Sequence, residues 1–588
     1  MKHLLFLLLI LSFSNSLLSQ AKNIQWGTVD SDGRFDELVR SKNGNYYGIR
    51  TIGNFIEELT NNYKTYLSLI EGANITKSIE LKTSIQGLRA EYQGMTLINN
   101  KLVIFYTINE KNSYKLYIQV FTDNLVEQNS ELELVSFELP KKYASESEIK
   151  IIKSVNGQFG GVLYVIEDNS KKEMSFGYVV LDSTLSVNSK GFQTVPKDAN
   201  YLSYGTQFVS NKGELYVSLN EKISSSRKKM KNGLLNNFRI GPFSFLPVQT
   251  YYNLDGYDDY DAIQRIHVYK CEQNQTVNLA CDLSKNCINK YKMGMTPDGN
   301  LVLIGSFLRV KNDKIITRSD LSMNGMFTLQ FDFLNKKISR EKYVDLSLNV
   351  YTYGLSDRKK LRIENNYAQG KLLPRLYDYR LKNVTILENG AILGHLEQTE
   401  RNVSYSSNNL GYGPYGASYG MGYGMGYGYG NYPYNNTTAN VSYYFKDVIV
   451  FSLKSDGTVN WMKKIQKYQV AGTYNGAFVS CFTYLTNSNY NLLFTDNAKN
   501  YAENGVFTAD KKVHGSPAFA KNNIISIVKM NTLTGETKRE QFLPKLENDG
   551  YYIPRDFMYD SLRNTMLVMS FNSGFGNKIR LGTLKLNE

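Results

Sequence analysis

The stretch that decides the fold reads NVTILENGAILGHLEQ (residues 383–398) and, after a long insert, KDVIVFSLKSDGTVNWMKKIQK (residues 446–467). It contains four short apolar runs, and the dipeptides Asn389-Gly390 and Asp456-Gly457 separate the two members of each pair. Asn-Gly and Asp-Gly between such runs predict hairpins, because both central residues of the turn must tolerate positive φ. The stretch therefore predicts one antiparallel sheet of four short strands, which cannot bury its faces alone.

The same unit recurs along the chain, and each first turn is followed by a β-rich run such as KLVIFYT or GGVLYVI. The first turns fall at Asn43-Gly44, Asn99-Asn100, Asn156-Gly157, Lys212-Gly213, Asp298-Gly299, Asn389-Gly390, Ser488-Asn489 and Arg563-Asn564. The first four are about 56 residues apart and the later ones 75 to 99. Recurrence at such spacings predicts stacked sheets. We therefore expect an all-β fold over residues 21–588, a single β-propeller of eight four-stranded blades, with seven as the alternative count. The one helix-like patch, residues 55–63, is expected to be a short excursion between strands.

The two tryptophans of the chain indicate how the ring closes. Trp461 falls in the fourth strand of the sixth unit, and Trp26 falls at the matching place in KNIQWGT (residues 22–28). The last unit has only three strands of its own. The N-terminal strand is therefore expected to complete the last blade and to remove its free edge.

Residues 1–20 have the pattern of an export signal, in which Lys2 and His3 precede the apolar run Leu4–Leu11 and a Ser-rich end follows. The run is shorter than the ~18 residues that a membrane-spanning helix needs. We expect a periplasmic or outer-membrane-associated protein that is peripheral to the membrane. The formal net charge is +14, and it becomes +13 when Lys2 is removed. Export argues against a nucleic-acid partner, so this charge favours an anionic glycan, lipopolysaccharide or an acidic face of an envelope protein, or serves only solubility.

Long insertions interrupt the later units at residues 221–264, 347–383, 398–445 and 496–522. In a propeller, the loops between second and third strands and those between blades leave on one face, so we expect all four insertions there. Loops on a rigid scaffold commonly carry binding residues. The candidate binding residues are the cations Arg227, Lys228, Lys229, Arg358, Lys359 and Lys360, and Tyr412, Tyr415, Tyr419, Tyr423 and Tyr427 of the Gly/Tyr-rich low-complexity loop 411–434.

Two catalytic-looking patterns in that loop lack the context that their chemistry needs. GASYG, around Ser418, fits G-x-S-x-G, which requires a strand, a sharp turn and a helix. GYGPYG fits G-x-G-x-x-G, which requires a βαβ unit. Histidine is scarce, with His267, His395 and His514 after the signal, which disfavours a catalytic triad or a multi-histidine metal centre. A glycosidase needs only two carboxylates, so that alternative stays open.

The cysteines are Cys271, Cys281, Cys287 and Cys481, in a chain expected outside the cytoplasm, where disulfides form. Cys281 and Cys287 close a short loop and are predicted to form a disulfide. Cys481, in AFVSCFTYL, is expected to be a buried free thiol. No cofactor and no metal site are expected. The Asp-rich stretch LDGYDDYDAI (residues 254–263) would hold calcium only weakly, because it lacks the D-x-[DN]-x-[DN]-G pattern.

The segment KDVIVFSLKSDGTVNWMKKIQ resembles the bacterial extracytoplasmic β-propeller repeat family, with an Asp, an apolar strand, an Asp-Gly turn and a Trp in order. The resemblance is clearest in residues 292–545 and implies a fold and an envelope location. Propellers host many functions, so it implies no activity. We expect a non-catalytic protein-interaction or scaffold module of a bacterial cell envelope, such as a subunit of an outer-membrane secretion or surface complex. The alternative is a carbohydrate-binding or carbohydrate-active propeller enzyme that uses paired carboxylates.

Overall fold

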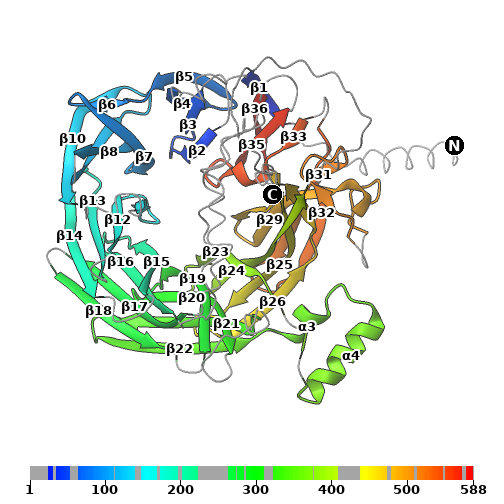
Figure 1. The fold of residues 1–588 in the computed structure, drawn as a ribbon. Helices are drawn as coiled ribbons and strands as arrows, with labels where there is room; N and C mark the ends of the chain where they lie inside the picture. The colour runs from blue at the N-terminus through cyan, green and yellow to red at the C-terminus, as the bar shows by residue number, and fades with distance from the viewer. Residues whose placement is uncertain are drawn as a thin grey trace, which may run out of the picture.

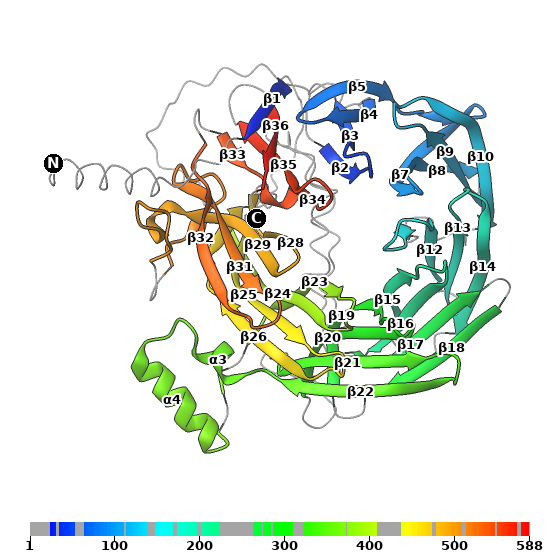
Figure 2. The same cartoon turned by 180° about the vertical axis from the view of Figure 1, so that it is seen from behind.

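The structure is a computed structural model that describes residues 24–30, 35–52, 64–110, 113–138, 148–168, 173–196, 202–222, 263–272, 275–283, 286–309, 322–371, 373–374, 376–407, 437–472, 478–508, 513–546, 550–572 and 578–586. Within these ranges the chain is all-β apart from two α-helices and two short 3-10 turns. The strands form seven sheets, and almost every pairing is antiparallel. The sheets follow one another in chain order around the molecule, so that the last lies beside the first (Figures 1 and 2).

The first three sheets are each built from consecutive strands. They contain β2 (Phe35–Arg40), β3 (Tyr46–Ile52), β4 (Lys64–Glu71) and β5 (Asn74–Glu80); then β6 (Ser84–Ile85), β7 (Leu88–Ile98), β8 (Lys101–Glu110), β9 (Ser113–Phe121) and β10 (Glu127–Glu138); then β11 (Glu148–Lys153), β12 (Gly160–Asp168), β13 (Glu173–Leu181) and β14 (Val187–Pro196).

The fourth sheet has eight strands, because one pairing, Ile263 with Ile288, joins two four-stranded units. Its strands are β15 (Leu202–Val209), β16 (Leu215–Lys222), β17 (Ile263–Glu272), β18 (Gln275–Asp282), β19 (Asn286–Met295), β20 (Leu301–Arg309), β21 (Gly325–Asp332) and β22 (Lys337–Asp345).

The remaining sheets continue the pattern. One contains β23 (Tyr379–Ile386), β24 (Ile392–Ser407), β25 (Thr437–Leu453), β26 (Val459–Ile465), β27 (Gln469–Gly472) and β30 (Ser516–Pro517); the next contains β28 (Cys481–Leu485), β29 (Asn489–Asn497), β31 (Asn523–Asn531) and β32 (Thr537–Leu543); the last contains β33 (Gly550–Tyr552), β34 (Met558–Asp560), β35 (Thr565–Asn572), β36 (Lys578–Lys585) and β1 (Gln25–Asp30). The 3-10 turns are η4 (Ala498–Asn500) and η5 (Pro554–Asp556).

The deciding stretch forms the four strands that its turns predict. Gly390 and Gly457 have φ of +78° and +81°, a conformation that side chains with a Cβ rarely adopt. Their amides donate to the carbonyls of Leu387 and Lys454 at 2.8 and 2.9 Å, and so close the two turns. Hairpin chemistry therefore sets the register of β23 to β26.

The N-terminal strand pairs with the C-terminal one, as predicted. β1 is antiparallel to β36, with Trp26 opposite Gly582, and the Trp26 ring stacks on Tyr552 with centroids 6.5 Å apart. The last sheet also packs face to face on the first through a cluster that includes Phe35, Ile70, Leu567, Met569 and Phe571. Burying each such side chain contributes about 1.5–3 kcal/mol, so the two ends of the chain stabilise one another.

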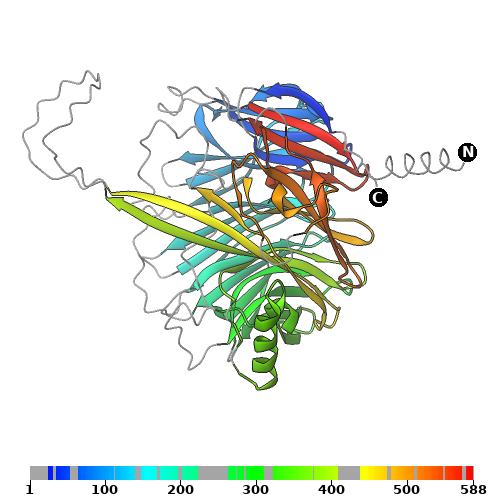
Figure 3. The ribbon, with the colours of Figure 1, turned by 90° about the vertical axis from the view of Figure 1, so that its right-hand side faces the viewer.

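The predicted linker 347–383 contains the helices α3 (Leu348–Thr352) and α4 (Asp357–Ala368). Both lie at the outer rim, beyond β22 and β26 (Figures 1 and 2). The hairpin of β24 and β25, in contrast, extends far out from one face (Figure 3). The expectation that all four insertions share a face is therefore wrong for 347–383, because this segment folds as helices, with Ile363 buried, instead of an open loop.

No helix in the described part of the chain is long and apolar enough to span a membrane.

Candidate functional site

Several predicted features lie outside the described ranges. They are the signal at 1–20, the patch at 55–63, Arg227, Lys228 and Lys229, the acidic residues Asp255, Asp258, Asp259 and Asp261, and Tyr412, Tyr415, Tyr419, Tyr423 and Tyr427 of the Gly/Tyr-rich loop.

The other predicted cations, Arg358, Lys359 and Lys360, lie together on α4. The Lys360 ammonium is 3.8 Å from the Asp357 carboxylate, and such solvent-exposed pairs contribute little to stability. The rim position of α4 separates these cations from the hairpin of β24 and β25 (Figure 3).

The predicted Cys281–Cys287 disulfide is absent, because all four cysteines are free thiols. Cys281 pairs with Ile266 near the end of β18, and Cys287 pairs with Leu308 at the start of β19. The short connection between them carries the chain from one four-stranded unit to the next, and strand pairing directs the two residues into different units. Cys481 is a free thiol, as predicted, but it is half-buried instead of buried, and its Sγ lies 3.3 Å from Oε1 of Glu397.

Glu397, on β24, is the centre of a buried polar cluster. Its Oε1 accepts from the Lys467 ammonium at 2.6 Å, and its Oε2 accepts from the Ser480 hydroxyl at 2.7 Å. Glu397 and Lys467 are both almost fully buried. Burial alone would raise the pKa of Glu397, but Lys467 and Lys382 together bring this pKa down to about 2. Glu397 is therefore a permanent anion inside the protein.

A second cation, Lys382, reaches the same carboxylate from β23, with its Nζ 3.7 Å from Oε2 of Glu397. The register between β23 and β24 shifts between Leu381 and Asn383, so Lys382 is the extra residue of a β-bulge. Bulges re-aim side chains and are frequent beside active sites. About a third of the Lys382 side chain is exposed, whereas Lys467 is enclosed.

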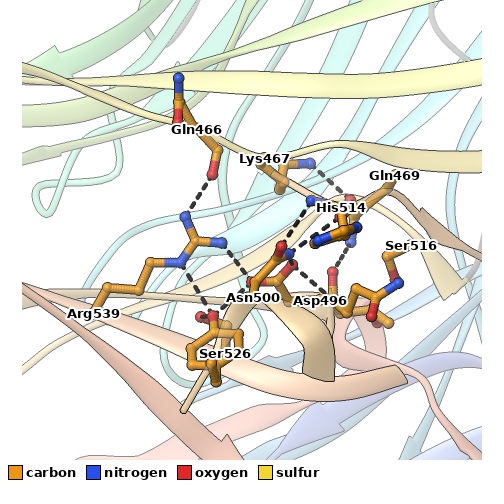
Figure 4. Close-up of polar contacts among 12 residues, drawn as sticks. Gln466, Lys467, Gln469, Asp496, Asn500, His514, Ser516, Ser526 and Arg539 are labelled. Atoms are coloured by element: carbon orange, nitrogen blue, oxygen red, sulfur yellow. Dashed lines mark hydrogen bonds and ion pairs between the residues drawn. The ribbon is translucent and has the colours of Figure 1, made fainter. Parts of the chain in front are cut away.

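An adjoining network fixes the segment between β29 and β31 (Figure 4). The Arg539 guanidinium contacts the Asp496 carboxylate and donates to the Gln466 carbonyl at 2.6 Å. The Asn500 amide donates to Asp496 at 2.8 Å, and its oxygen accepts from the His514 amide at 2.7 Å. Arg539 and Asp496 are both buried and paired, so we assign this network to stability and not to chemistry.

A more accessible group of charges lies at the base of the β24–β25 hairpin. Asp378 precedes β23 with a φ of +62°, and its carbonyl accepts from the Thr399 amide at 2.9 Å. This contact places Asp378 beside Glu400, which forms an ion pair with Lys446. Burial, and then the negative charge of Glu400, raise the pKa of Asp378 to about 6. Asp378 thus holds its proton to a higher pH than an ordinary carboxyl group, and the neighbouring Glu400 is paired with a cation.

Aromatic rings flank this carboxyl pair. Tyr444 is directly opposite Glu400 in the β24–β25 register, so their side chains share one face of the hairpin. The Tyr444 and Tyr468 rings have centroids 6.2 Å apart, and Tyr468 is 38% exposed. The Lys446 ammonium lies 5.6 Å from the centroid of Tyr444. The group therefore combines a buried carboxyl, Asp378, with a partly exposed ion pair and flat apolar rings.

In the described part of the chain, no three or more His, Cys, Asp or Glu side chains form a group that could hold a metal ion. The chemistry that Asp378 and Glu400 can perform is proton transfer, from the protonated carboxyl of one and to the carboxylate of the other.

Comparison with known proteins gave structural similarity alone. No family model and no curated protein matches the sequence. Among solved structures, the chain is similar to the polysaccharide lyase Uly1, with a TM-score of 0.34 and 10% identity over 96% of this chain and 100% of that one. It is also similar to the GH93 α-L-arabinofuranosidase of Fusarium graminearum (TM-score 0.27, 8% identity, 63% of this chain and 93% of that one) and to the Synechocystis apocarotenoid oxygenase (TM-score 0.32, 8% identity, 91% and 95%).

The expectations of a non-catalytic scaffold and of no enzyme activity are corrected by this comparison, because these similar structures are those of enzymes. The reaction named for each of those proteins is its own. For this chain, the class that the observations define is an all-β protein of successive antiparallel sheets. Its carboxyl pair, Asp378 and Glu400, lies at the base of the β24–β25 hairpin. The hairpin extends from one face (Figure 3).

Sequence reasoning missed Asp378, Glu400 and Lys382. The chain contains 54 Asp and Glu residues, so a carboxylate alone is no signal. The strand that begins with the apolar run at Ile392 was expected to end at Leu396. It continues to Ser407, so Glu397 and Glu400 lie on the strand and not in a loop. The bulge at Lys382 depends on the pairing of β23 with β24, which no single segment reveals.

Proposed function

We propose that the protein is a closed eight-bladed β-propeller that cleaves a glycan with Asp378 and Glu400. The ring is supported by the pairing of β1 with β36 and by the packing of the last sheet on the first. The count is supported by the division of the eight-stranded sheet into two four-stranded units joined by a single pairing. Closure removes the free sheet edges, which an open array would expose.

The observation that carries the proposed activity is the position of Asp378 beside Glu400 on paired segments at the base of the hairpin. A general acid must be protonated near the working pH, and a general base must be ionised. Burial favours the first condition at Asp378, and the Glu400 carboxylate beside it forms an ion pair with Lys446. Tyr444 and Tyr468 offer flat faces on which sugar rings stack.

In the proposed reaction Asp378 donates its proton to the glycosidic oxygen as the bond from this oxygen to the anomeric carbon breaks. Glu400 accepts a proton from water, and the water oxygen bonds to the anomeric carbon. Atoms and charges balance, and no cofactor takes part. This division of labour between two carboxyl groups is the one that glycoside hydrolysis requires.

The site of action that we propose is the periplasm or the outer membrane, with the protein peripheral to the membrane. The leader-like residues 1–20 and the resemblance to extracytoplasmic propeller repeats support it. Fractionation of cells that express the full chain, with and without residues 1–20, tests this location. Recovery of both forms in the cytoplasm would contradict it.

The activity is tested by measuring new reducing ends after incubation with a panel of neutral and acidic polysaccharides. Asp378→Asn and Glu400→Gln should each lower the rate by about 100-fold or more, since proton transfer contributes that much. Glu388→Gln is the matched control, because Glu388 lies in the exposed turn after β23 of the same sheet. Cleavage by Asp378→Asn at the unmodified rate would disprove the assignment.

A further inference from the structure

We infer that the glycan is anionic and that Lys382 binds its acidic group. This inference rests on the proposed function and names the substrate class of the same site. Three observations carry it: the position of Lys382 in a bulge, the excess of cations around Glu397, and the partial exposure of the Lys382 side chain.

The charges around Glu397 do not cancel. Lys467 lies closer to the carboxylate, at 2.6 Å, and is enclosed. Lys382 lies at 3.7 Å, beyond hydrogen-bond distance, and its ammonium is 6.0 Å from the centroid of the Phe445 ring. One carboxylate carries a single negative charge, so Glu397 cannot neutralise both ammonium groups in full.

The surplus charge is the accessible one. Among the described residues, Glu397 is the anion with which the Lys382 ammonium forms an ion pair. Burial lowers the pKa of Lys382, and the charges of Arg380 and Arg555 lower it further against the effect of Glu397. These two arginines therefore lie within electrostatic reach, although Arg555 comes from the last sheet, on η5. An anion bound here would add to the effect of Glu397 in stabilising the charged form of Lys382.

The bulge explains why Lys382 lies outside the regular ladder. In a regular β23, Lys382 would take the place of the next residue in the ladder opposite His395, which is buried and bonded to the Tyr490 hydroxyl at 2.8 Å. The extra residue keeps His395 opposite Asn383 and leaves Lys382 free of the ladder. Extra residues of this kind commonly orient a side chain toward a ligand.

The ligand chemistry that fits is a carboxylate or sulfate on a sugar ring. Asp378 and Arg380 are two residues apart at the start of β23, so the cation cluster begins beside the proposed acid. A uronic acid or a sulfated sugar next to the scissile bond would reach Lys382 with its charge while a neighbouring ring lies on Tyr444 and Tyr468. Charge-assisted hydrogen bonds of this type are about twice as strong as neutral ones.

The test is calorimetric binding to the Asp378→Asn chain, whose turnover under the proposed function is about 100-fold slower or more. The probes are hexagalacturonate, its methyl ester, which has the same length and no charge, and a sulfated galactan hexasaccharide. We expect one acidic probe to bind at least about 10-fold more tightly than the ester. This preference should fall with added salt. Whichever acidic probe binds identifies carboxylate or sulfate as the recognised group.

Lys382→Met should remove the preference, and Lys382→Arg should keep most of it. Lys337→Met, an exposed lysine at the start of β22, is the matched control and should change nothing. Melting temperatures show whether Lys382→Met folds, and the arginine variant tests the charge if it does not. Equal binding of ester and acid, or a preference that survives in Lys382→Met, overturns the inference. Acid binding without cleavage by the native chain overturns the proposed function alone.

Discussion

The Lys467 ammonium lies 2.6 Å from Oε1 of Glu397, and almost no water reaches either side chain. Lys467 follows β26, and Glu397 lies on β24, so the pair joins the outer and inner parts of one sheet. The same ammonium donates to Oε1 of Gln469 at 2.7 Å, and the Gln469 amide donates to the Thr495 carbonyl of the next sheet at 2.9 Å. The ion pair is thus part of the contact between two sheets.

Replacement of this lysine alone should be costly. Lys467→Met leaves Glu397 buried with the more distant Lys382 as its remaining cation, and we expect a loss of ~3–5 kcal/mol in the free energy of unfolding. Urea denaturation followed by circular dichroism measures this loss. The double variant with Glu397→Gln should recover most of it, because no buried charge is then uncompensated.

A matched control for that comparison is Lys64, whose ammonium lies 2.9 Å from Glu80 on the surface. Lys64→Met should cost less than about 1 kcal/mol, because solvent screens an exposed pair. Equal losses for Lys64→Met and Lys467→Met would contradict the role assigned to burial.

The stability of the protein should carry a pH dependence from Asp378. Its pKa is raised from 3.8 to about 6 in the fold, so the folded state holds a proton that the unfolded chain releases between these values. The contribution of Asp378 to the free energy of unfolding is therefore fully present below about pH 4 and is lost as the pH rises through about 6. Asp378→Asn should stabilise the protein at pH 7 by ~1–3 kcal/mol and have little effect at pH 3.5.

Unfolding in urea at the two pH values measures the effect of Asp378→Asn. Glu388→Gln, in an exposed turn, serves as the control and should behave as the unmodified chain at both. A variant less stable than the unmodified protein at pH 7 would show that Asp378 is held ionised and would remove its role as an acid.

Loss of the N-terminal strand should open the last sheet. Deletion of residues 21–30 removes every pairing of β1 with β36 and the stacking of Trp26 on Tyr552. We expect a fall of at least ~3 kcal/mol in unfolding free energy, since an edge is exposed and packing is lost. Differential scanning calorimetry measures it, with Leu334→Ala, a side chain 91% exposed, as the control. An unchanged melting temperature would mean that β1 does not hold the two ends together.

The free thiols should be present but unreactive in the folded protein. Burial raises the pKa of Cys281 to about 12, and it also raises the pKa values of Cys271 and Cys481. Since the thiolate is the nucleophile, iodoacetamide should label none of these three in the native protein at pH 8 and all of them after denaturation without reductant. Mass spectrometry of the peptides reads the result. A Cys281 peptide that is labelled only after reduction would restore the disulfide.

Local chemistry determined what the sequence could predict. The turns at Gly390 and Gly457 need positive φ, and the apolar runs on either side need partners, so strand positions and hairpin pairing follow from neighbouring residues. The match of Trp26 with Trp461 was sufficient to pair β1 with β36, because both occupy the last strand of a unit. Helix α4 had a local signal too, a serine before DRKKLRIENNYA, but a long linker between strands was expected to be a loop.

The tertiary structure alone decided where the charges meet. Asp378 and Glu400 are 22 positions apart in the sequence, and Lys382 and Arg555 come from different sheets, so their proximity depends on pairings and packing that no local pattern encodes. Spacing also misled at Cys281 and Cys287, because a short loop can join two separate four-stranded units. Local turn chemistry sets which strands form, but the environment of a side chain, and hence its pKa and its access to a ligand, is a property of everything packed around it.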